Sequence, residues 1–289
     1  MIGLLSLLVI ATAIVIVSVA AVGAFAAWKP PRHATGWALA HHHPTSPAEL
    51  SIEHQEWFLD RPGGARLCVW DVPGTNPKAP SIMLLHGWSR SKLTWLNHLT
   101  EWQGRGSRII IPDLRGHGDS TPDGVTLGDR DAKDIAALLS VLDEERVILV
   151  GRSLGGVVAI NAATEATNIA GVIAIAPYIR LRHTIRARVL QHGLPALGVV
   201  PVAMMMLWLL GVRSSPTIRA AQKLEAPLLI IHGTCDSISK LADAHALAEA
   251  TANATLIEVE NAGHGNHWEL EAERLDREVE SFIESCTHS

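Results

Sequence analysis

From about residue 52 onward, short apolar runs typical of buried strands alternate with longer segments of helical pattern. The first two runs predict an antiparallel opening pair. We predict strands over 56–60, 66–72, 81–85, 108–112, 146–150, 169–176, 227–231 and 254–259. We predict helices over 93–103, 127–142, 154–164, 241–250 and 267–283, the second of them capped by Thr126. Strands that alternate with helices form a mostly parallel sheet with helices on both faces, so the predicted fold class is α/β.

The size of the chain fits one such domain with an appendage. It has 289 residues, of which 48% are hydrophobic, and single α/β domains often contain about 200–250 residues. Its formal net charge of -5 argues against a nucleic-acid partner, because such a partner requires a basic surface. Three scattered cysteines form no disulfide framework and favour a reducing compartment. They are Cys68, Cys235 and Cys286, and we expect Cys235 to be a small buried hydrophobe.

The strand predicted over 146–150 leads into a serine turn. The sequence there is Gly151-Arg152-Ser153-Leu154-Gly155. In parallel sheets, ligands bind at the carboxyl ends of the strands. A serine on a tight strand-to-helix turn adopts a strained backbone, and the flanking glycines leave room for it. The amide of Leu154 then lies at a helix N-terminus, where it can stabilise an oxyanion. This pattern predicts that Ser153 is a catalytic nucleophile.

Two further strand ends carry the residue types that such a serine requires. Asp236 follows the predicted strand at 227–231, and His264 follows the last predicted strand. A serine hydroxyl becomes an effective nucleophile when an imidazole takes its proton, and a carboxylate fixes the tautomer of that imidazole. The order serine, aspartate, histidine is the one that this kind of fold imposes. We therefore predict a catalytic triad of Ser153, Asp236 and His264, with His267 as the alternative base.

A second oxyanion donor is expected in the loop after the strand at 81–85. The sequence there is His86-Gly87-Trp88. Gly87 permits a close approach of the backbone to the site, and the backbone N–H of Trp88 is the candidate donor. We expect the side chains of His86 and Trp88 to serve in packing.

The chain resembles the α/β-hydrolase superfamily from about residue 52 to its end. The motifs that carry the resemblance are 84–87, 113–120, 151–156, 232–236 and 263–265. The resemblance implies the acyl-transfer machinery of serine esterases and lipase-like hydrolases, with no cofactor and no metal ion. Because the candidate nucleophile is a serine, it points away from the haloalkane dehalogenases and epoxide hydrolases of the superfamily, which use an aspartate. Residues 113–120 resemble the loop after the fourth strand in esterases and lactonases. The resemblance implies a structural role for this loop, in which it braces the floor of the site.

An apolar segment precedes the domain. Residues 1–28 contain no Asp, Glu, Lys or Arg, and about 20 apolar residues are enough to span a bilayer. We predict a retained transmembrane helix; the alternative is a cleaved signal peptide, which would have a basic start and a shorter apolar core. Lys29 and Arg32 follow the segment, so the positive-inside rule places the hydrolase domain, 51–289, in the cytoplasm. A linker rich in proline and histidine is predicted over 29–50.

A long insertion over 180–221 separates the serine from the aspartate, and we expect it to form a lid. Its centre, 193–212, is uncharged, but Pro195 and Pro201 are expected to break it. A single further membrane crossing here would also place the predicted nucleophile and acid on opposite sides of the bilayer. Two interpretations stay open. The insertion packs over the active site, or it lies on the bilayer with its arginines at anionic headgroups.

Together these features predict a membrane-anchored, single-pass serine hydrolase that cleaves a lipophilic carboxylic ester through an acyl-enzyme on Ser153, with lipids among the candidate substrates. A thioesterase, lactonase, amidase or cofactor-free haloperoxidase would use the same triad. A hydrolase-fold protein that only binds a ligand is the alternative from another class. The intact set of three residues argues against that alternative, because binding alone requires no triad. The expected partners are a small-molecule ester and the bilayer; the oligomeric state stays open.

Overall fold

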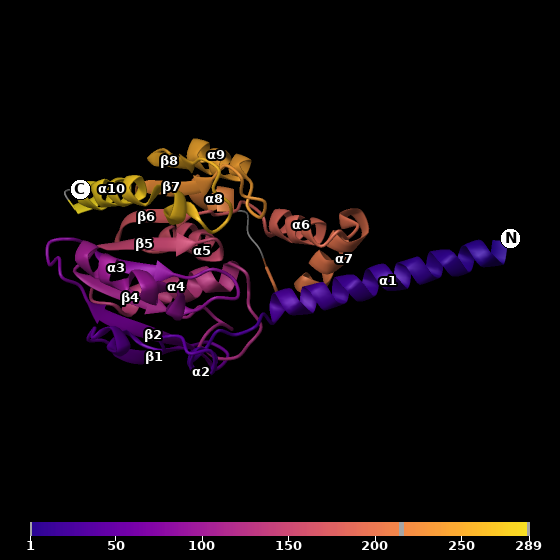
Figure 1. Cartoon of the computed structure of the whole chain (residues 1–289), viewed down its shortest axis with the longest axis horizontal. Coiled ribbons are helices and arrows are strands. Elements are labelled where there is room, and N and C mark those ends of the chain that lie inside the picture. Colours follow the sequence, from indigo (N-terminus) through magenta and orange to yellow (C-terminus); the bar gives the residue numbers. More distant parts are fainter. Residues whose placement is uncertain (1, 214–216, 288–289) are drawn as a thin grey trace.

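The computed structural model describes residues 2–213 and 217–287. Its centre is an eight-stranded sheet in the order β1-β2-β4-β3-β5-β6-β7-β8 (Figure 1). The strands are β1 (Gln55–Arg61), β2 (Ala65–Pro73), β3 (Ser81–Leu85), β4 (Arg108–Pro112), β5 (Val147–Arg152), β6 (Ile169–Ile175), β7 (Leu228–Gly233) and β8 (Ala254–Val259). All eight predicted strands are present, and their ends differ from the prediction by at most two residues.

The sheet is mostly parallel, as predicted. Strands β1 and β2 form the antiparallel opening pair, β2 is antiparallel to β4, and the remaining neighbours are parallel. All residues of β3 and β7 are buried. A strand covered on both faces must be apolar along its whole length, which explains the continuous apolar runs of the sequence.

Helices cover both faces of the sheet (Figure 1). They are α1 (Ile2–Trp28), α2 (Thr35–Ala40), α3 (Leu99–Arg105), α4 (Asp129–Val141), α5 (Leu154–Ala163), α6 (Leu181–Gln191), α7 (Ala196–Leu209), α8 (Thr217–Ala221), α9 (Leu241–Ala250) and α10 (His267–Thr287), with 3-10 turns η1 (Pro47–Leu50) and η2 (Lys92–His98). Helices α3 and α10 bury Trp102 and Leu275 in the core of one face. Helices α4, α5 and α9 contribute Ile135, Val158 and Leu247 to the core of the other face.

Three local predictions are corrected. The segment at 93–103 begins as the 3-10 turn η2 and only then continues as α3. Thr126 is not the N-cap of α4: its hydroxyl donates to the Asp131 carboxylate, which also accepts the N–H of Gly128, so the helix begins two residues later than predicted. Cys235 is exposed rather than buried.

Helix α1 is the candidate membrane span. Its stretch Gly3–Trp28 has 26 residues with a mean hydropathy of 2.8. Most of its side chains are exposed, as for Leu4 with 76% and Val22 with 71% of the side-chain surface accessible. Figure 1 shows its amino-terminal part projecting away from the domain, whereas its carboxyl end lies against the domain.

The insertion forms α6, α7 and α8, and α7 packs alongside α1 (Figure 1). The expected break at Pro201 is wrong, because α7 continues through this residue. A proline inside a helix removes one backbone hydrogen bond, and the exposed ring of Pro201 crowds no neighbouring element of the described structure. The break expected at Pro195 is present, because this residue lies between the end of α6 and the first residue of α7.

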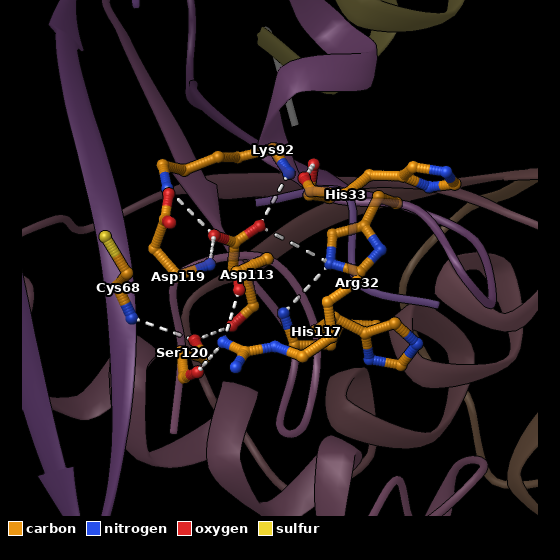
Figure 2. A network of polar contacts seen from close by, with 12 residues as sticks. Arg32, His33, Cys68, Lys92, Asp113, His117, Asp119 and Ser120 are labelled. Atoms are coloured by element: carbon orange, nitrogen blue, oxygen red, sulfur yellow. Dashed lines mark hydrogen bonds and ion pairs between the residues drawn. The ribbon is translucent and has the colours of Figure 1, made fainter. Parts of the chain in front are cut away.

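The segment after α1 contacts the domain along much of its length. The Arg32 guanidinium donates to the carbonyl oxygens of Gly118 and Ser120, the latter at 2.6 Å (Figure 2). Thr35 donates to the Asp119 carboxylate through both its N–H and its hydroxyl. The segment that follows the carboxyl end of α1 is therefore held against the loop at 113–120.

Candidate active site

Ser153 lies on a strained turn between β5 and α5. Its φ of 55° and ψ of -113° are unfavourable for a residue with a side chain. A Cβ atom at Gly151 would lie 2.1 Å from the carbonyl oxygen of Gly155, and one at Gly155 would lie 2.2 Å from that of Leu85. The two glycines are thus required by close backbone contacts, and they let the serine side chain stand clear of the turn.

The three predicted side chains lie within hydrogen-bonding distance of one another. The His264 Nε2 atom is 2.9 Å from the Ser153 Oγ atom. The His264 Nδ1 atom is 2.7 Å from the Asp236 Oδ2 atom. Ser153 follows β5, Asp236 follows β7 and His264 follows β8, so three strand ends bring together residues that are far apart in the chain. The arrangement can carry a proton from the hydroxyl to the imidazole.

Asp236 is held as a carboxylate. Burial raises its pKa, but the hydrogen bond and charge of His264 and the amides of Ile238 and Ser239 outweigh burial and leave the pKa below its ordinary value. These amides donate to its Oδ1 atom at 2.8 and 2.9 Å. An ionised Asp236 requires the proton of His264 to be on Nδ1, so that Nε2 is free to accept the serine proton.

His267, the alternative base, lies outside this chain of contacts. Its side chain is buried at the start of α10, and neither ring nitrogen has a hydrogen-bond partner among the described residues. Burial lowers its pKa to about 4, which keeps it neutral at pH 7. The structure thus brings His264, not His267, to the serine.

The two predicted oxyanion donors belong to segments that lie next to Ser153. Leu154 is the first residue of α5, so its N–H has no partner within the helix. Trp88 follows Gly87, where a Cβ atom would lie 3.3 Å from the Arg152 carbonyl oxygen and 3.6 Å from the Ser153 Cβ atom. The loop therefore passes close to the serine, as predicted from the glycine.

Side chains position this loop. The buried ring of His86 contacts the Gly87 carbonyl oxygen at 2.8 Å through Nδ1, and its Nε2 accepts the N–H of Leu114 at 3.0 Å. The Trp88 indole nitrogen donates to the carbonyl oxygen of Ala27, the penultimate residue of α1, at 3.0 Å. The packing roles expected for both side chains agree with these contacts.

A buried lysine, which the sequence did not point to, supports the loop at 113–120 (Figure 2). The Lys92 ammonium has no exposed surface and lies 2.8 Å from the Asp113 Oδ2 atom and 2.6 Å from that of Asp119. The Lys92 N–H also donates to Asp113. Ser120 links this cluster to the sheet, since its hydroxyl donates to the Asp113 carbonyl oxygen and accepts the N–H of Cys68. The cluster fixes the loop at 113–120, whose Leu114 N–H contacts His86 beside the proposed oxyanion loop.

An apolar cavity of about 240 Å³ has Ser153 and Leu154 in its wall. Helices α1, α6 and α7 supply most of the remaining wall. The α1 residues that line it are Val19, Ala20, Gly23, Ala24, Ala26 and Ala27. The α7 residues that line it are Val199, Ala203 and Leu207.

A second cavity, of about 450 Å³, also contains Ser153 and has a different character. His264 and three arginines, Arg90, Arg152 and Arg188, line it, and its lining includes no Asp or Glu. The guanidinium of Arg188 lies 4.8 Å from the ring centroid of Trp88, which also borders both cavities. The serine thus lies between an apolar and a basic cavity.

The sheet order, the helices on both faces and the nucleophile-type turn define a class of α/β proteins with a strand-end active site. Comparison with known families agrees with this class. The model of the alpha/beta hydrolase family matches residues 82–278, and the chain belongs to this family. The predicted α/β-hydrolase fold is confirmed.

Two relatives that match part of the chain are named as hydrolases. Epoxide hydrolase A of Mycobacterium tuberculosis is 33% identical over 116 residues, which are 39% of this chain and 35% of that protein. The protein named probable protein phosphatase methylesterase 1 of Caenorhabditis elegans is 36% identical over 144 residues, 45% of this chain and 40% of that protein. The chain thus spans less than half the length of these relatives.

Solved structures share the fold over most of the chain. An esterase of Pyrococcus furiosus superposes with a TM-score of 0.69 at 22% identity, covering 89% of this chain and 98% of the esterase. An esterase of a Rhodococcus species gives a TM-score of 0.60 at 20% identity, covering 81% of this chain and 100% of that one.

Proposed function

We propose that this protein is a membrane-anchored serine hydrolase that cleaves a carboxylic ester with a lipophilic acyl group. The observation that carries the proposal is the hydrogen-bonded chain from Ser153 through His264 to Asp236, with distances of 2.9 and 2.7 Å. Such a chain activates a hydroxyl for attack on a carbonyl group.

The reaction proceeds in two halves. The Ser153 Oγ atom attacks the carbonyl carbon while His264 Nε2 takes its proton, and the N–H groups of Leu154 and Trp88 stabilise the negative oxygen that forms. His264 then protonates the leaving alcohol as its bond to carbon breaks, which leaves an acyl group on Ser153. Water attacks this acyl-enzyme with the same base, and the carboxylic acid departs.

The two cavities beside Ser153 support a substrate with two different ends. The apolar cavity favours a lipophilic acyl group, because its wall consists mainly of aliphatic side chains. The basic cavity favours a negatively charged leaving group, because its arginines meet no carboxylate in the lining. The leaving group then lies beside His264, which must protonate it.

An ester pair with the same acyl group tests the leaving-group assignment. We expect Arg152→Gln to raise KM about tenfold or more for 4-carboxyphenyl butyrate, since a charged hydrogen bond contributes about 1.5–3 kcal/mol, and to leave KM for 4-nitrophenyl butyrate unchanged. Arg130→Gln, on the exposed side of α4, is the control. Equal effects of Arg152→Gln on both esters would remove the charge preference.

Membrane anchoring by α1 forms part of the proposal. Its length and apolar composition suit a span. The packing of α7 and of residues 113–120 against the end of α1 and the segment after it supports a retained helix rather than a cleaved signal peptide, because cleavage would remove a wall of the apolar cavity. With Lys29 and Arg32 after the span, the catalytic domain faces the cytoplasm.

Exposed apolar side chains on α7 favour contact of the insertion with the bilayer. Leu197 is 93% exposed, and Trp208 and Leu209 are 56% and 68% exposed, next to a helix that itself spans the membrane in this proposal. A water-facing surface seldom gathers so many large apolar groups. Both interpretations of the insertion can therefore hold together, because α7 lines the cavity on one side and meets lipid on the other.

The identity of the nucleophile favours an ester hydrolase over an epoxide hydrolase. Ser153 occupies the position that an aspartate would hold in the superfamily's epoxide hydrolases, so the partial likeness to one of these carries no activity to this chain. Thioesterase, lactonase, amidase and haloperoxidase reactions would use the same residues and differ in the substrate alone.

Covalent labelling tests the proposed nucleophile. A fluorophosphonate probe is expected to label the wild-type protein and the control Ser140→Ala, which changes an exposed serine of α4, but not Ser153→Ala. Hydrolysis of 4-nitrophenyl esters of increasing chain length then defines the acyl preference. Equal labelling of Ser153→Ala and wild type would refute the assignment, and a strict preference for acetyl esters would refute the lipophilic substrate.

A further inference from the structure

The carboxyl end of α1 is fixed to the catalytic domain by specific contacts. The N–H of Val125 donates to the Trp28 carbonyl oxygen at 2.8 Å. A Cβ atom at Gly124 would lie 1.9 Å from the Trp28 indole, so the glycine leaves the space that this ring fills. The indole of Trp88 donates to the Ala27 carbonyl oxygen. These contacts hold the end of the apolar helix beside the loop that carries an oxyanion donor.

One side of α1 is buried, although the rest of the helix is exposed. Ala20 has no exposed surface and Ala24 has 1%. Ile16 contacts α7 at Gly198, where a Cβ atom would lie 3.1 Å from the isoleucine side chain. The spacing of 16, 20, 24 and 27 places these residues on one side of a helix. The buried side of α1 thus faces the catalytic domain and α7.

Small residues on and beside this side leave room for the apolar cavity. Ala20, Gly23, Ala24 and Ala27 all line it together with Ser153. Gly23 is exposed and borders the cavity, and a Cβ atom there would meet no atom within 4 Å, so a larger side chain can be added at this border. A helix that served only as an anchor would have no need to leave a hollow in front of the nucleophile.

We propose that the last three turns of α1 form a wall of the acyl-binding cavity, so that the membrane anchor itself selects long acyl chains and admits them from the bilayer. This inference rests on the proposed function and names the substrate class: a long-chain acyl ester already dissolved in the membrane. The occupant is its acyl chain, with the ester carbonyl at Ser153.

The position of the wall explains how such a substrate arrives. Helix α1 continues from the cavity into its exposed apolar part, and α7 lies alongside it with Leu197 and Trp208 exposed. A chain that slides along α1 passes from lipid to the cavity while its methylene groups stay in apolar surroundings. Transfer through water would instead expose each methylene group to water, which is unfavourable.

Two glycines of α1 provide a matched test. Gly23→Leu adds a side chain at the border of the cavity, whereas Gly3→Leu makes the same change near the other end of the helix, where the Cβ atom likewise meets no neighbour. With full-length protein in vesicles, we expect Gly23→Leu to lower kcat/KM for 4-nitrophenyl palmitate about tenfold or more, in line with the effect of a single methylene group on a tight pocket. The value for 4-nitrophenyl butyrate should stay within about twofold, and Gly3→Leu should match wild type.

The short ester also reports whether the variant is folded. Gly23→Leu could lower kcat/KM for both esters equally while fluorophosphonate labelling stays at the wild-type rate, or it could lower kcat/KM for neither ester. Either result would show that α1 is not a wall of the acyl site. Loss of hydrolysis of both esters and of fluorophosphonate labelling would also count against the inference. It would show that the added side chain disrupts the folded core rather than an acyl-binding cavity.

Photo-crosslinking separates this inference from the proposed reaction. A palmitate with a terminal diazirine, added to full-length Ser153→Ala in vesicles, should crosslink to residues 19–27, and Gly23→Leu in the same background should abolish these crosslinks. If wild type hydrolyses no ester while the crosslinks persist, the proposed reaction fails and the acyl site stands. Crosslinks at 3–13 alone, or at 19–27 in both proteins equally, would show chains in the surrounding bilayer and overturn the inference.

Discussion

The indole nitrogen of Trp88 lies 3.0 Å from the carbonyl oxygen of Ala27 and donates a hydrogen bond to it. Trp88 supplies a backbone N–H to the proposed oxyanion hole, and Ala27 is the penultimate residue of the apolar helix that lines the acyl cavity. A single side chain therefore connects the anchor to the catalytic loop, and a change in one is expected to reach the other.

Replacing Trp88 with phenylalanine removes this hydrogen bond and keeps the backbone N–H. A hydrogen bond of this kind contributes about 1 kcal/mol, so we expect kcat for a short ester to fall by about fivefold or less, with a larger loss for a palmitoyl ester. Trp57→Phe, on β1, is the matched control. Wild-type kinetics of Trp88→Phe with both esters would show that the contact plays no part in the site.

Replacing Asp236 with asparagine should remove most of the activity. The amide cannot stabilise the imidazolium and favours the wrong tautomer of His264, which in a triad of this type costs about 10⁴-fold in kcat. His267→Gln is the control, because it changes the neighbouring buried histidine that has no contact with the serine in the described structure. Steady-state kinetics with a butyrate ester measure kcat for both variants. A larger loss in His267→Gln than in Asp236→Asn would reverse the assignment of the base.

Lys92→Met is expected to destabilise the fold by about 3–5 kcal/mol, because Asp113 would stay buried without its cation. Lys133→Met removes a surface pair with Asp129, whose two groups lie 3.7 Å apart, and should change stability by less than about 1 kcal/mol. Urea unfolding followed by circular dichroism compares them. Similar midpoints for the two variants would mean that the buried cluster does not brace the site.

The stability of the fold is expected to fall in mild acid. Burial lowers the pKa of His86 to about 4, that of His117 to about 3 and that of His267 to about 4. In the unfolded chain an imidazole titrates near 6.5. Between these values the unfolded chain binds more protons, so the stabilisation is complete above about pH 6.5 and decreases as the pH falls toward 4.

Urea midpoints between pH 7.5 and 5 test this dependence. His117→Asn should give a shallower loss of stability with falling pH than wild type, whereas His41→Asn, which changes an exposed residue of the segment after α1, should follow wild type. A pH dependence that is identical in all three proteins would exclude His117 as a source.

Most of the sheet could be predicted from the sequence because its signals are local. The buried strand β3 and the edge strand β8 are short runs rich in apolar residues, and their predicted ends coincide with the observed ones. The positions of Ser153, Asp236 and His264 after three strands predicted that they would meet, because parallel strands end at the same edge. The catalytic roles assigned to them stay predictions.

Contacts between distant segments could not be predicted in the same way. Arg32 pairs with a loop 86 and 88 residues away, and Lys92 pairs with an aspartate that no local pattern connects to it. The apolar pattern of α1 indicated its length but not that one side would be buried against α7. At Pro201 the local rule was misleading, because the loss of one backbone hydrogen bond did not end the helix.

Trapping the covalent intermediate is the sharpest measurement for this enzyme. Full-length protein in vesicles would be mixed with 4-nitrophenyl palmitate, quenched in acid within the first turnover, digested and analysed by mass spectrometry. We predict a palmitoyl group on the peptide that contains Ser153, absent from Ser153→Ala. Ester turnover without any acyl group on Ser153, or with the acyl group on another residue, would contradict the proposed mechanism.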